Sequence, residues 1–511
     1  MRPGSVAARC TTLQHTGATM RTTPQFADLV SPGFARMPFR CQRQGVIHPL
    51  VFSFPLASAA LLNGCARAVT TSAPATAQIS AQRPQYASTY QRRTSAPVLI
   101  RNATLLTAAG PEQQHASILF ADGKIVAIGA DVAAPPDATV LDGTGKFVTP
   151  GIIDTHSHMG VYAAPGSPAE SDGNEATNPV TAQVWAEHSF WPQDPQIPLA
   201  VAGGITVIQA LPGSANLIGG RSATLRLVPA RTVQEMKFPG APYGLKMACG
   251  ENPKRVYGQR MNGPSTRMGN MAGYRAAFIE AERYRAKWDR WLKTHTGDPP
   301  ERDLKLETLA EVLRGHILPH IHCYRADEMA QMIDLSKEFG FKIRSFHHAV
   351  EAYKIADLLA REGIAASVWD DWWGFKMEAL DGIPENAALL ERAGVRPIMH
   401  SDDPNVIQRL NQEAAKAMYA GRRIGIDIKP EQAIRWITAN PAWALGIDST
   451  TGTLERGKSA DVVLWSGDPF SVYSRAEKVY NDGWLVFDRT DTTRQWKTDF
   501  NLGTAAPGVG R

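Results

Sequence analysis

At residues 148–158 the sequence reads VTPGIIDTHSH, an apolar run that passes directly into polar residues. Short apolar runs of this kind are typical of buried strands. Alternate residues of an extended strand face the same side, so His156 and His158 can direct both imidazoles at one ion. The His-x-His pattern is weak by itself, because an ordinary pair of polar loop residues looks the same.

After this stretch, buried-type strands alternate with helix-like segments. The expected strands are 204–211, 243–248, 317–322, 341–346, 364–369 and 396–400, and the expected helices include 326–339, 351–362, 386–393, 406–420 and 430–445. Strands that alternate with helices favour a parallel sheet, and six or more such units favour a closed barrel over two open sheets. We therefore predict an α/β fold with a (β/α)8 TIM barrel at its centre.

Short β-like runs flank the barrel on both sides. They lie within residues 98–141, and similar runs return at 461–465 and 484–488. The simplest arrangement is a composite β-sandwich formed from both ends of the chain. The predicted divisions are 1–96 for an export signal and linker, 97–147 and 447–511 for the two parts of the sandwich (the second with a tail), and 148–446 for the barrel.

The first 78 residues have the composition of a leader. They hold seven of the 54 Lys and Arg residues and one of the 49 acids, so the remainder carries one more acid than base. The remainder therefore gives no electrostatic reason to expect nucleic acid as a partner. Arg40 and Arg43 precede an apolar stretch at 46–62 and then small residues, which is the order of an export signal. A membrane-spanning helix is the weaker alternative, because the apolar stretch is about 17 residues long and contains Pro55.

The leader offers two endings. Cleavage after Ala77 would release a soluble protein, whereas Cys65, which follows Leu62-Asn63-Gly64, would be the site of a lipid anchor. We predict export to a bacterial periplasm or envelope, with both forms open.

Outside the leader the chain has two cysteines, Cys249 and Cys323, because Cys10, Cys41 and Cys65 precede residue 78. Their spacing is not that of a disulfide framework, and we expect two small buried residues.

Three further positions carry metal-binding side chains at the ends of predicted strands: His322, His348 and Asp402. A barrel gathers the C-terminal ends of its strands around one mouth, so these residues can converge with His156 and His158. Several imidazoles and one carboxylate suit a zinc-like divalent ion with one position left for water. The alternative is a set of polar strand-end residues that hold no metal.

The order of these motifs resembles the amidohydrolase superfamily, in particular its imidazolonepropionase-related branch. The resemblance covers roughly residues 97–490 and rests on 148–158, on His322, on HAVEAYK at 348–354, on Ser401-Asp402 and on GTLERGKSADVV at 452–463. It implies a metal-dependent hydrolase barrel in which His156 and His158 bind a first ion. Asp402 would be a further ligand and the general base for attack by metal-bound hydroxide, since a divalent ion lowers the pKa of water from 15.7 to ~7.

The resemblance also implies roles for the later strands. His322 and His348 would hold a second ion, or one of them would orient or polarise the substrate carbonyl if only one ion binds. In binuclear relatives the fourth strand supplies a bridging carboxylate, either Glu or a Lys carboxylated by carbon dioxide. Lys246 and Glu251 are the two candidates for the bridge, and a mononuclear site is the third alternative.

Several neighbours of these positions have two interpretations each. Arg325 can clamp a substrate carboxylate or stabilise an oxyanion, or it can pair with Asp327 or Glu328. His347 and His400 are expected in packing or hydrogen bonding, although a shift of one residue in register would make His347 the ligand instead of His348. We also expect a Gly-bearing loop at 213–221 near the substrate and a solvated helix at 280–293. Two roles are open for Trp369, Trp372 and Trp373: they form an aromatic wall of the substrate pocket, or they pack at the barrel rim.

We therefore predict an exported amidohydrolase that binds one or two divalent ions, with zinc expected. Its substrate would be a dipeptide, an N-acyl amino acid or a cyclic amide, and the reaction would cleave a C–N bond. The alternative is a non-catalytic envelope binding protein on the same barrel, which would not need both a complete ligand set and an acidic base. A serine hydrolase is disfavoured, because no Gly-x-Ser-x-Gly elbow follows a strand. The oligomeric state stays open.

Overall fold

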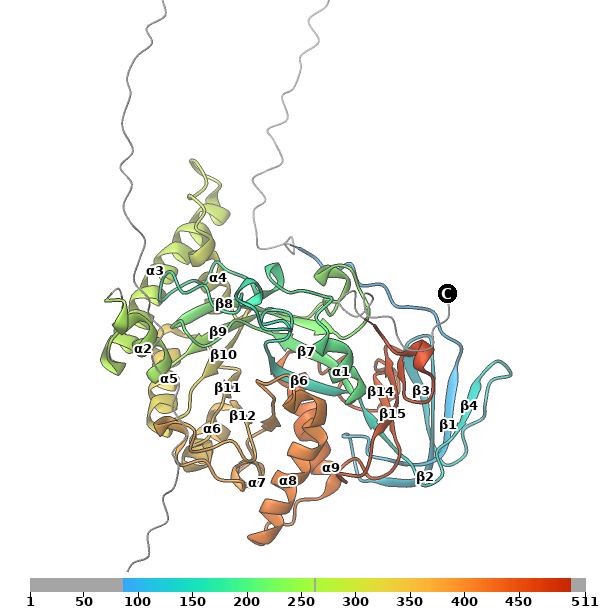
Figure 1. Cartoon of the computed structure of the whole chain (residues 1–511). Helices are drawn as coiled ribbons and strands as arrows, with labels where there is room; N and C mark the ends of the chain where they lie inside the picture. The colour runs from blue at the N-terminus through green and yellow to red at the C-terminus, as the bar shows by residue number, and fades with distance from the viewer. Residues whose placement is uncertain (1–85, 262, 498–511) are drawn as a thin grey trace, which may run out of the picture. The chain divides into compact units, whose positions relative to one another are not determined.

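The structure of the protein is a computed structural model that describes residues 86–261 and 263–497 (Figure 1). The predicted export signal, with its alternative endings at Ala77 and Cys65, lies outside the described residues. The described part contains a barrel sheet and a second, separate sheet. Within it, no helix combines the length and the apolar character that crossing a membrane requires.

The barrel sheet has eight strands, as the sequence predicted. In order around the sheet they are β6 (Ile152–Ser157), β7 (Ile205–Ala210), β8 (Ile218–Arg226), β9 (Gly244–Ala248), β10 (Leu318–His322), β11 (Ser345–His347), β12 (Ala365–Val368) and β13 (Pro397–Met399). Nearly every residue in these strands is buried. Their sequences are therefore continuous apolar runs without an alternation of apolar and polar residues, because both faces of the sheet are covered. The backbone amide of Asp402 donates to the carbonyl of His156 (3.0 Å) and links the two ends of the sheet.

The third strand of the barrel differs from the parallel prediction. β8 is antiparallel to both β7 and β9, and it includes part of the stretch 213–221 that the sequence predicted as a loop. The connection from β7 to β8 spans only residues 211–217. A parallel crossover needs a dozen or more residues, so this short connection forces the chain to reverse.

Ten α-helices accompany the described strands. They are α1 (Gln196–Ala202), α2 (Glu251–Gln259), α3 (Arg267–Thr294), α4 (Leu304–Leu313), α5 (Ala326–Phe339), α6 (Ala356–Glu362), α7 (Asn386–Arg392), α8 (Leu410–Arg423), α9 (Pro430–Ala433) and α10 (Ala439–Ala444). Two of the three helices between β9 and β10 begin at side-chain caps. Thr266 Oγ1 accepts from the amide of Gly269 (3.0 Å) at α3, and Asp303 Oδ1 accepts from the amide of Leu306 (2.9 Å) at α4.

α3 is longer and better packed than the solvated helix expected at 280–293. Its buried residues recur at helical spacing along one face and include Tyr274, Ala277, Phe278, Ala281, Tyr284 and Trp288. A stripe of this kind buries one face against the protein and leaves the charged face in water. The charged residues of 280–293 therefore cover the outside of a packed helix.

The second sheet joins the two ends of the chain, and the predicted composite is confirmed. Its strands are β1 (Val98–Leu105), β2 (Gln113–Ala121), β3 (Lys124–Gly129), β4 (Thr139–Asp142), β5 (Phe147–Pro150), β14 (Val462–Trp465), β15 (Ala476–Asn481) and β16 (Trp484–Asp488). β5 pairs with β14 in antiparallel register, with Thr149 opposite Val463. Blue N-terminal and red C-terminal strands therefore lie side by side in Figure 1.

A buried ion pair connects the second sheet to the barrel. Arg226, the last residue of β8, donates from Nη1 to Asp461 Oδ1 and to Asn481 Oδ1, both at 2.8 Å. Arg226 and Asp461 are each 2% exposed. Because each charge is desolvated and satisfied by the other, removal of either one would leave an uncompensated charge in the interior.

The expectation for Cys249 and Cys323 is wrong in one respect. Both are buried, but they form a disulfide, with their Cα atoms 5.2 Å apart. Cys249 directly follows β9 and Cys323 directly follows β10, and the amide of Cys249 donates to the carbonyl of His322 (2.9 Å). Neighbouring strands therefore bring the two thiols together although 74 positions separate them in the chain.

Candidate metal centre

The polar ends of β6 and β13 are held together by a buried carboxylate. Asp154 Oδ1 accepts hydrogen bonds from the amides of His156 (3.0 Å) and Ser401 (3.2 Å), and its Oδ2 accepts from the Ser401 hydroxyl (2.5 Å). Burial raises the pKa of Asp154 to about 7, against these hydrogen bonds. This clamp places His156 and Asp402 next to each other from opposite ends of the sheet.

Asp402 lies among three imidazoles. Its Oδ1 is 3.1 Å from His158 Nε2 and 3.3 Å from His156 Nε2, and its Oδ2 is 4.0 Å from His348 Nε2. Burial would raise the pKa of Asp402, but its interactions with the neighbouring His158, Lys246 and His400 outweigh burial and hold the pKa below its ordinary value. Both Asp402 and His348 have positive φ, 61° and 56°, a strained conformation for non-glycine residues that the surrounding structure must impose.

The hydrogen bond on the far side of His158 fixes which nitrogen faces Asp402. His158 Nδ1 lies 2.9 Å from the carbonyl oxygen of Leu211. Because a carbonyl only accepts, Nδ1 carries the proton, and in the neutral ring Nε2 presents a lone pair. A lone pair 3.1 Å from a carboxylate oxygen is repulsive unless a cation or a proton lies between them.

The same reasoning assigns His348. His400 Nδ1 lies 3.0 Å from the carbonyl oxygen of Val368, so it donates there, and its Nε2 accepts from His348 Nδ1 at 2.7 Å. His348 Nε2 then presents its lone pair on the side of Asp402. His400, which the sequence placed in packing or hydrogen bonding, holds His348 in this tautomer. Nitrogen atoms of His156, His348 and His400 also lie within 4.8 Å of one another, but in this arrangement both nitrogens of His400 are already engaged.

His347 extends from the other side of His156. Its Nδ1 lies 2.7 Å from His156 Nδ1, and its Nε2 lies 3.1 Å from Nδ1 of His320. All three rings are buried, and burial lowers the pKa of His320 to about 3 and holds those of His156 and His347 well below the ordinary value. The structure therefore places His348 beside Asp402 and His347 behind His156. His320 had no part in the sequence interpretation, although its alternation with His322 in the strand could have indicated that it faces the same side.

Lys246 reaches the histidine cluster from β9. Its side chain is almost completely buried, and Nζ lies 3.3 Å from His156 Nε2 and donates to the carbonyl of Pro212 (3.0 Å). Burial lowers the pKa of Lys246 to about 7, against the opposing charge of Asp402. A large share of the amine is therefore neutral near neutral pH, which is the form that reacts with carbon dioxide.

The remaining candidates separate into one near the cluster and one away from it. The ring of His322 lies 4.7 Å from that of His348 between centroids, and His322 Nδ1 is buried without a hydrogen-bond partner among the described residues. Glu251 begins α2 and forms an ion pair with Lys376 (3.5 Å). Of the two predicted bridging groups, Lys246 is thus the one in contact with a histidine of the cluster.

Arg325 lies at the start of α5 and is engaged with an acid. Its Nε and Nη2 donate to the two carboxylate oxygens of Asp327, both at 2.9 Å, and its side chain is 41% exposed. This is the structural pairing with an acid that the sequence left open as the alternative to substrate binding. An interaction with substrate would require Arg325 to leave Asp327.

Aromatic rings pack on the histidines at the mouth. Trp369 stacks on His348 (4.4 Å between centroids) and on His400 (4.9 Å), and Trp372 lies 5.2 Å from Trp369. Trp369 is 4% exposed, whereas Trp373 and Phe375 are 43% and 56% exposed. Trp369 therefore packs on the proposed ligand His348, and the exposed ring of Phe375 lies 6.1 Å from Trp369 between centroids.

The donor set fits a divalent cation. Imidazoles and a carboxylate are ligand types that zinc-like ions take. The lone pair of His158 toward Asp402 and the buried Nδ1 of His322, which has no hydrogen-bond partner among the described residues, are both available to a cation. Two groups, His156 with His158 and Asp402, and His156 with His348 and His400, have their ligand atoms within 4.8 Å of one another.

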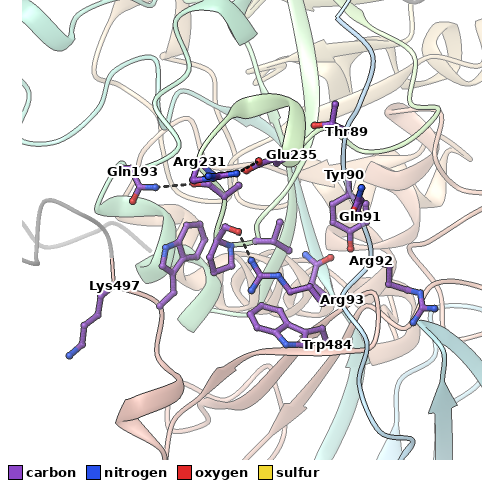
Figure 2. Close-up of a pocket in the computed structure, with 15 residues that line it drawn as sticks. Thr89, Tyr90, Gln91, Arg92, Arg93, Gln193, Arg231, Glu235, Trp484 and Lys497 are labelled. Atoms are coloured by element: carbon purple, nitrogen blue, oxygen red, sulfur yellow. Dashed lines mark hydrogen bonds and ion pairs between the residues drawn. The ribbon is translucent and has the colours of Figure 1, made fainter.

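Two cavities lie apart from this cluster. One, of about 770 Å³, lies beside Trp484 of β16 and is lined by Arg92, Arg93 and Arg231 (Figure 2). The other, of about 700 Å³, is lined by Arg221 of β8 and residues of α3 and α4. Neither lining includes a histidine of the cluster, so the metal chemistry and these cavities are separate features of the molecule.

A barrel with a histidine-rich metal site at the C-terminal ends of its strands defines a class of hydrolases, and comparison with known proteins agrees. The model of the "Amidohydrolase family" matches residues 319–487. A crystal structure of an amidohydrolase from Thermotoga maritima MSB8 is 39% identical, with a TM-score of 0.71, over 77% of this chain and 100% of that one. The chain therefore belongs to the amidohydrolase family and is a hydrolase.

Two curated relatives show how far the likeness extends. Amidohydrolase tasK of Hapsidospora irregularis is 33% identical over 430 residues, which are 77% of this chain and 43% of that protein, so the chain spans less than half of this relative. The imidazolonepropionase of Mesorhizobium japonicum is 23% identical over 431 residues, covering 75% of this chain and 94% of that protein. The predicted resemblance to the imidazolonepropionase-related branch is thus confirmed at the level of the family.

Proposed function

We propose that the protein hydrolyses a C–N bond of a dipeptide, an N-acyl amino acid or a cyclic amide, with Asp402 as general base. One observation carries the proposal: the carboxylate of Asp402 lies 3.1 Å from a lone-pair nitrogen of His158 and 3.3 Å from Nε2 of His156. A divalent ion bound by these groups, zinc in our proposal, would supply Lewis acidity and lower the pKa of water. Asp402 would take the proton of the attacking water and pass it to the leaving nitrogen.

Lys246 supports a binuclear form of the site. Its amine is in contact with His156 and is partly neutral, so reaction with carbon dioxide would convert it into a carbamate that bridges two ions. His322 and His348 would hold the second ion, and His348 is oriented for this by its hydrogen bond to His400 (2.7 Å). The ion pair of Glu251 with Lys376 makes Glu251 the weaker candidate for the bridge.

The location of the protein is part of the proposal. We place it outside the cytoplasm of a bacterium, because the leader has the order of an export signal and because disulfides persist in oxidising compartments, where Cys249–Cys323 would be stable. Export favours dipeptides or N-acyl amino acids as substrates over a step of histidine breakdown. No nucleic acid is expected as a partner, and a lipid anchor at Cys65 is the alternative to a soluble form.

Metal content and hydrolysis test this function together. Protein that begins near Gln78 is purified with and without bicarbonate and analysed for metal per chain. We expect two equivalents of a zinc-like metal, with the second dependent on bicarbonate and lost in Lys246→Ala. Hydrolysis of a panel of dipeptides, N-acyl amino acids and cyclic amides should then require the metal and be lost in Asp402→Asn while the first ion is retained.

The alternatives give different results. One equivalent that is insensitive to Lys246→Ala would indicate a mononuclear site. Absence of bound metal would refute the hydrolase mechanism. The non-catalytic binding protein would be favoured by a different result. In that case the metal is retained, no compound of the panel is hydrolysed, and wild type and Asp402→Asn bind ligands equally well.

A further inference from the structure

The cavity of about 700 Å³ lies between the outside of β8 and the helices α3 and α4. Its walls are rich in aromatic side chains: Tyr86, Trp185, Tyr243, Tyr284 and Trp288. Arg221 of β8 also lines it, with 9% of the residue exposed. The cavity thus combines an aromatic wall with one buried guanidinium group.

Arg221 points away from the metal centre. Its neighbour Ser222 faces the barrel interior, where its hydroxyl accepts a hydrogen bond from Gln209 (2.9 Å). Alternate residues of a strand face opposite sides, and Arg221 contacts Thr308 of α4 and Trp185 on the outside of the sheet. The cavity and the histidine cluster are therefore on opposite faces of the same strand.

Among the described residues, no carboxylate lies within 4.0 Å of the Arg221 guanidinium. The one side-chain hydrogen bond that the guanidinium makes within this part of the chain runs from Nε to Thr308 Oγ1 (2.8 Å). The acids in the vicinity hold other cations. Their pairs are Glu187 with Lys237 (2.7 Å), Glu307 with Arg302 (2.5 Å), and Glu311 with Arg314 (2.8 Å). The charge of Arg221 is thus left without a close counter-ion of the described chain.

The Arg221 guanidinium stacks on aromatic rings, and its two Nη groups have no hydrogen-bond partner among the described residues. The guanidinium carbon lies 4.1 Å from the centroid of the Trp185 ring and 5.6 Å from that of Tyr243. Stacking occupies the face of the guanidinium, and Thr308 occupies Nε, so the two Nη groups remain as a planar fork. Such a fork matches the two oxygens of a carboxylate. Burial lowers the pKa of Arg221, and an anion would offset that desolvation.

We propose that this cavity is a second ligand site, separate from the metal centre, which binds a small aromatic carboxylate. The Nη fork of Arg221 holds the carboxylate, and the rings of Trp185, Tyr284 and Trp288 pack on the aromatic part of the ligand. Aromatic rings in contact gain more than their buried area alone supplies. This site does not depend on the proposed hydrolase activity, since none of its residues belongs to the histidine cluster.

The other cavity provides a matched control. There the guanidinium of Arg93 also stacks on a tryptophan, with its carbon 4.2 Å from the centroid of the Trp484 ring, and Nη2 donates to the carbonyl of Pro229 (2.7 Å) (Figure 2). Arg93 is exposed, so water competes for its donors. A carboxylate gains less there than at a buried fork.

Calorimetric titration of the metal-loaded protein tests the proposal, with indole-3-acetate as the probe and indole-3-acetamide as its uncharged analogue. We expect the acid to bind at least tenfold more tightly than the amide. Arg221→Gln should weaken binding of the acid at least tenfold, whereas Arg93→Gln should leave it unchanged. Binding should also persist after chelation of the metal, because a carboxylate held by Arg221 does not contact the ion.

Several outcomes would overturn the proposal. They are equal binding of acid and amide, no binding of the acid at about 1 mM, binding that survives Arg221→Gln, and binding that is lost with the metal. The comparison of acid and amide uses wild-type protein, so it stays decisive if Arg221→Gln fails to fold. Arg221→Lys then adds a second variant, which keeps the charge but lacks the planar fork and should also weaken binding of the acid.

Discussion

Loss of the Cys249–Cys323 disulfide should destabilise the protein by about 4 kcal/mol. The bond closes a segment with a sequence separation of 74, and the chain-entropy relation for a loop of this size gives about 15 cal/mol/K, or about 4 kcal/mol at 25 °C. The loop contains α2, α3 and α4 between β9 and β10, so the reduced, unfolded chain gains the freedom of this whole insertion.

The assay is urea unfolding of the wild type with and without a reductant, alongside the double variant Cys249→Ala and Cys323→Ala. The wild type should lose about 4 kcal/mol of unfolding free energy on reduction. The double variant should have the unfolding free energy of the reduced wild type, and the reductant should not change it. An equal free energy in the reduced and oxidised wild type would refute the reasoning. A loss in the double variant on adding reductant would show that the reductant acts elsewhere.

Three further predictions follow from buried groups. Arg226→Met should cost about 3–5 kcal/mol of unfolding free energy, because it leaves Asp461 charged and buried, and the double variant with Asp461→Leu should recover part of that loss in urea unfolding. His400→Phe should weaken metal binding about 10–100-fold in a competition titration, because His348 loses the acceptor that orients its ring. Burial raises the pKa of Asp370 to about 7, so the folded state holds this proton more tightly than the unfolded chain. Stability should therefore fall as the pH rises from about 4 to about 7, by up to ~4 kcal/mol, and Asp370→Asn should remove this part of the pH dependence.

Each of these has a result that contradicts it. An Arg226→Met protein as stable as the wild type would mean that the buried pair is not needed for stability. Unchanged metal affinity in His400→Phe would show that His348 is held by its packing on Trp369 alone. If Asp370→Asn and the wild type have parallel stability profiles between pH 4 and pH 7, Asp370 does not titrate as its burial requires.

The sequence alone indicated the barrel, the composite sheet and the positions of the histidines, because these depend on local properties of the chain. An apolar run bounded by turn residues is a strand wherever it packs, and a polar residue at its C-terminal end faces the mouth of a barrel. His156, His158 and Asp402 could therefore be predicted to converge from their places at strand ends. The antiparallel β8 escaped this reasoning, because its glycines and polar residues resemble a loop.

The tertiary structure decided the features that depend on contacts between strands. Whether His347 or His348 faces Asp402 follows from the turn after β11 and the positive φ of His348, and the Cys249–Cys323 bond follows from the adjacency of β9 and β10. Neither contact leaves a local signal, because its partners lie far apart in the chain. The surroundings of Arg221 also depend on tertiary contacts. Nothing in the sequence distinguishes Arg221 from other strand residues, because its cavity forms only when β8, α3 and α4 pack together.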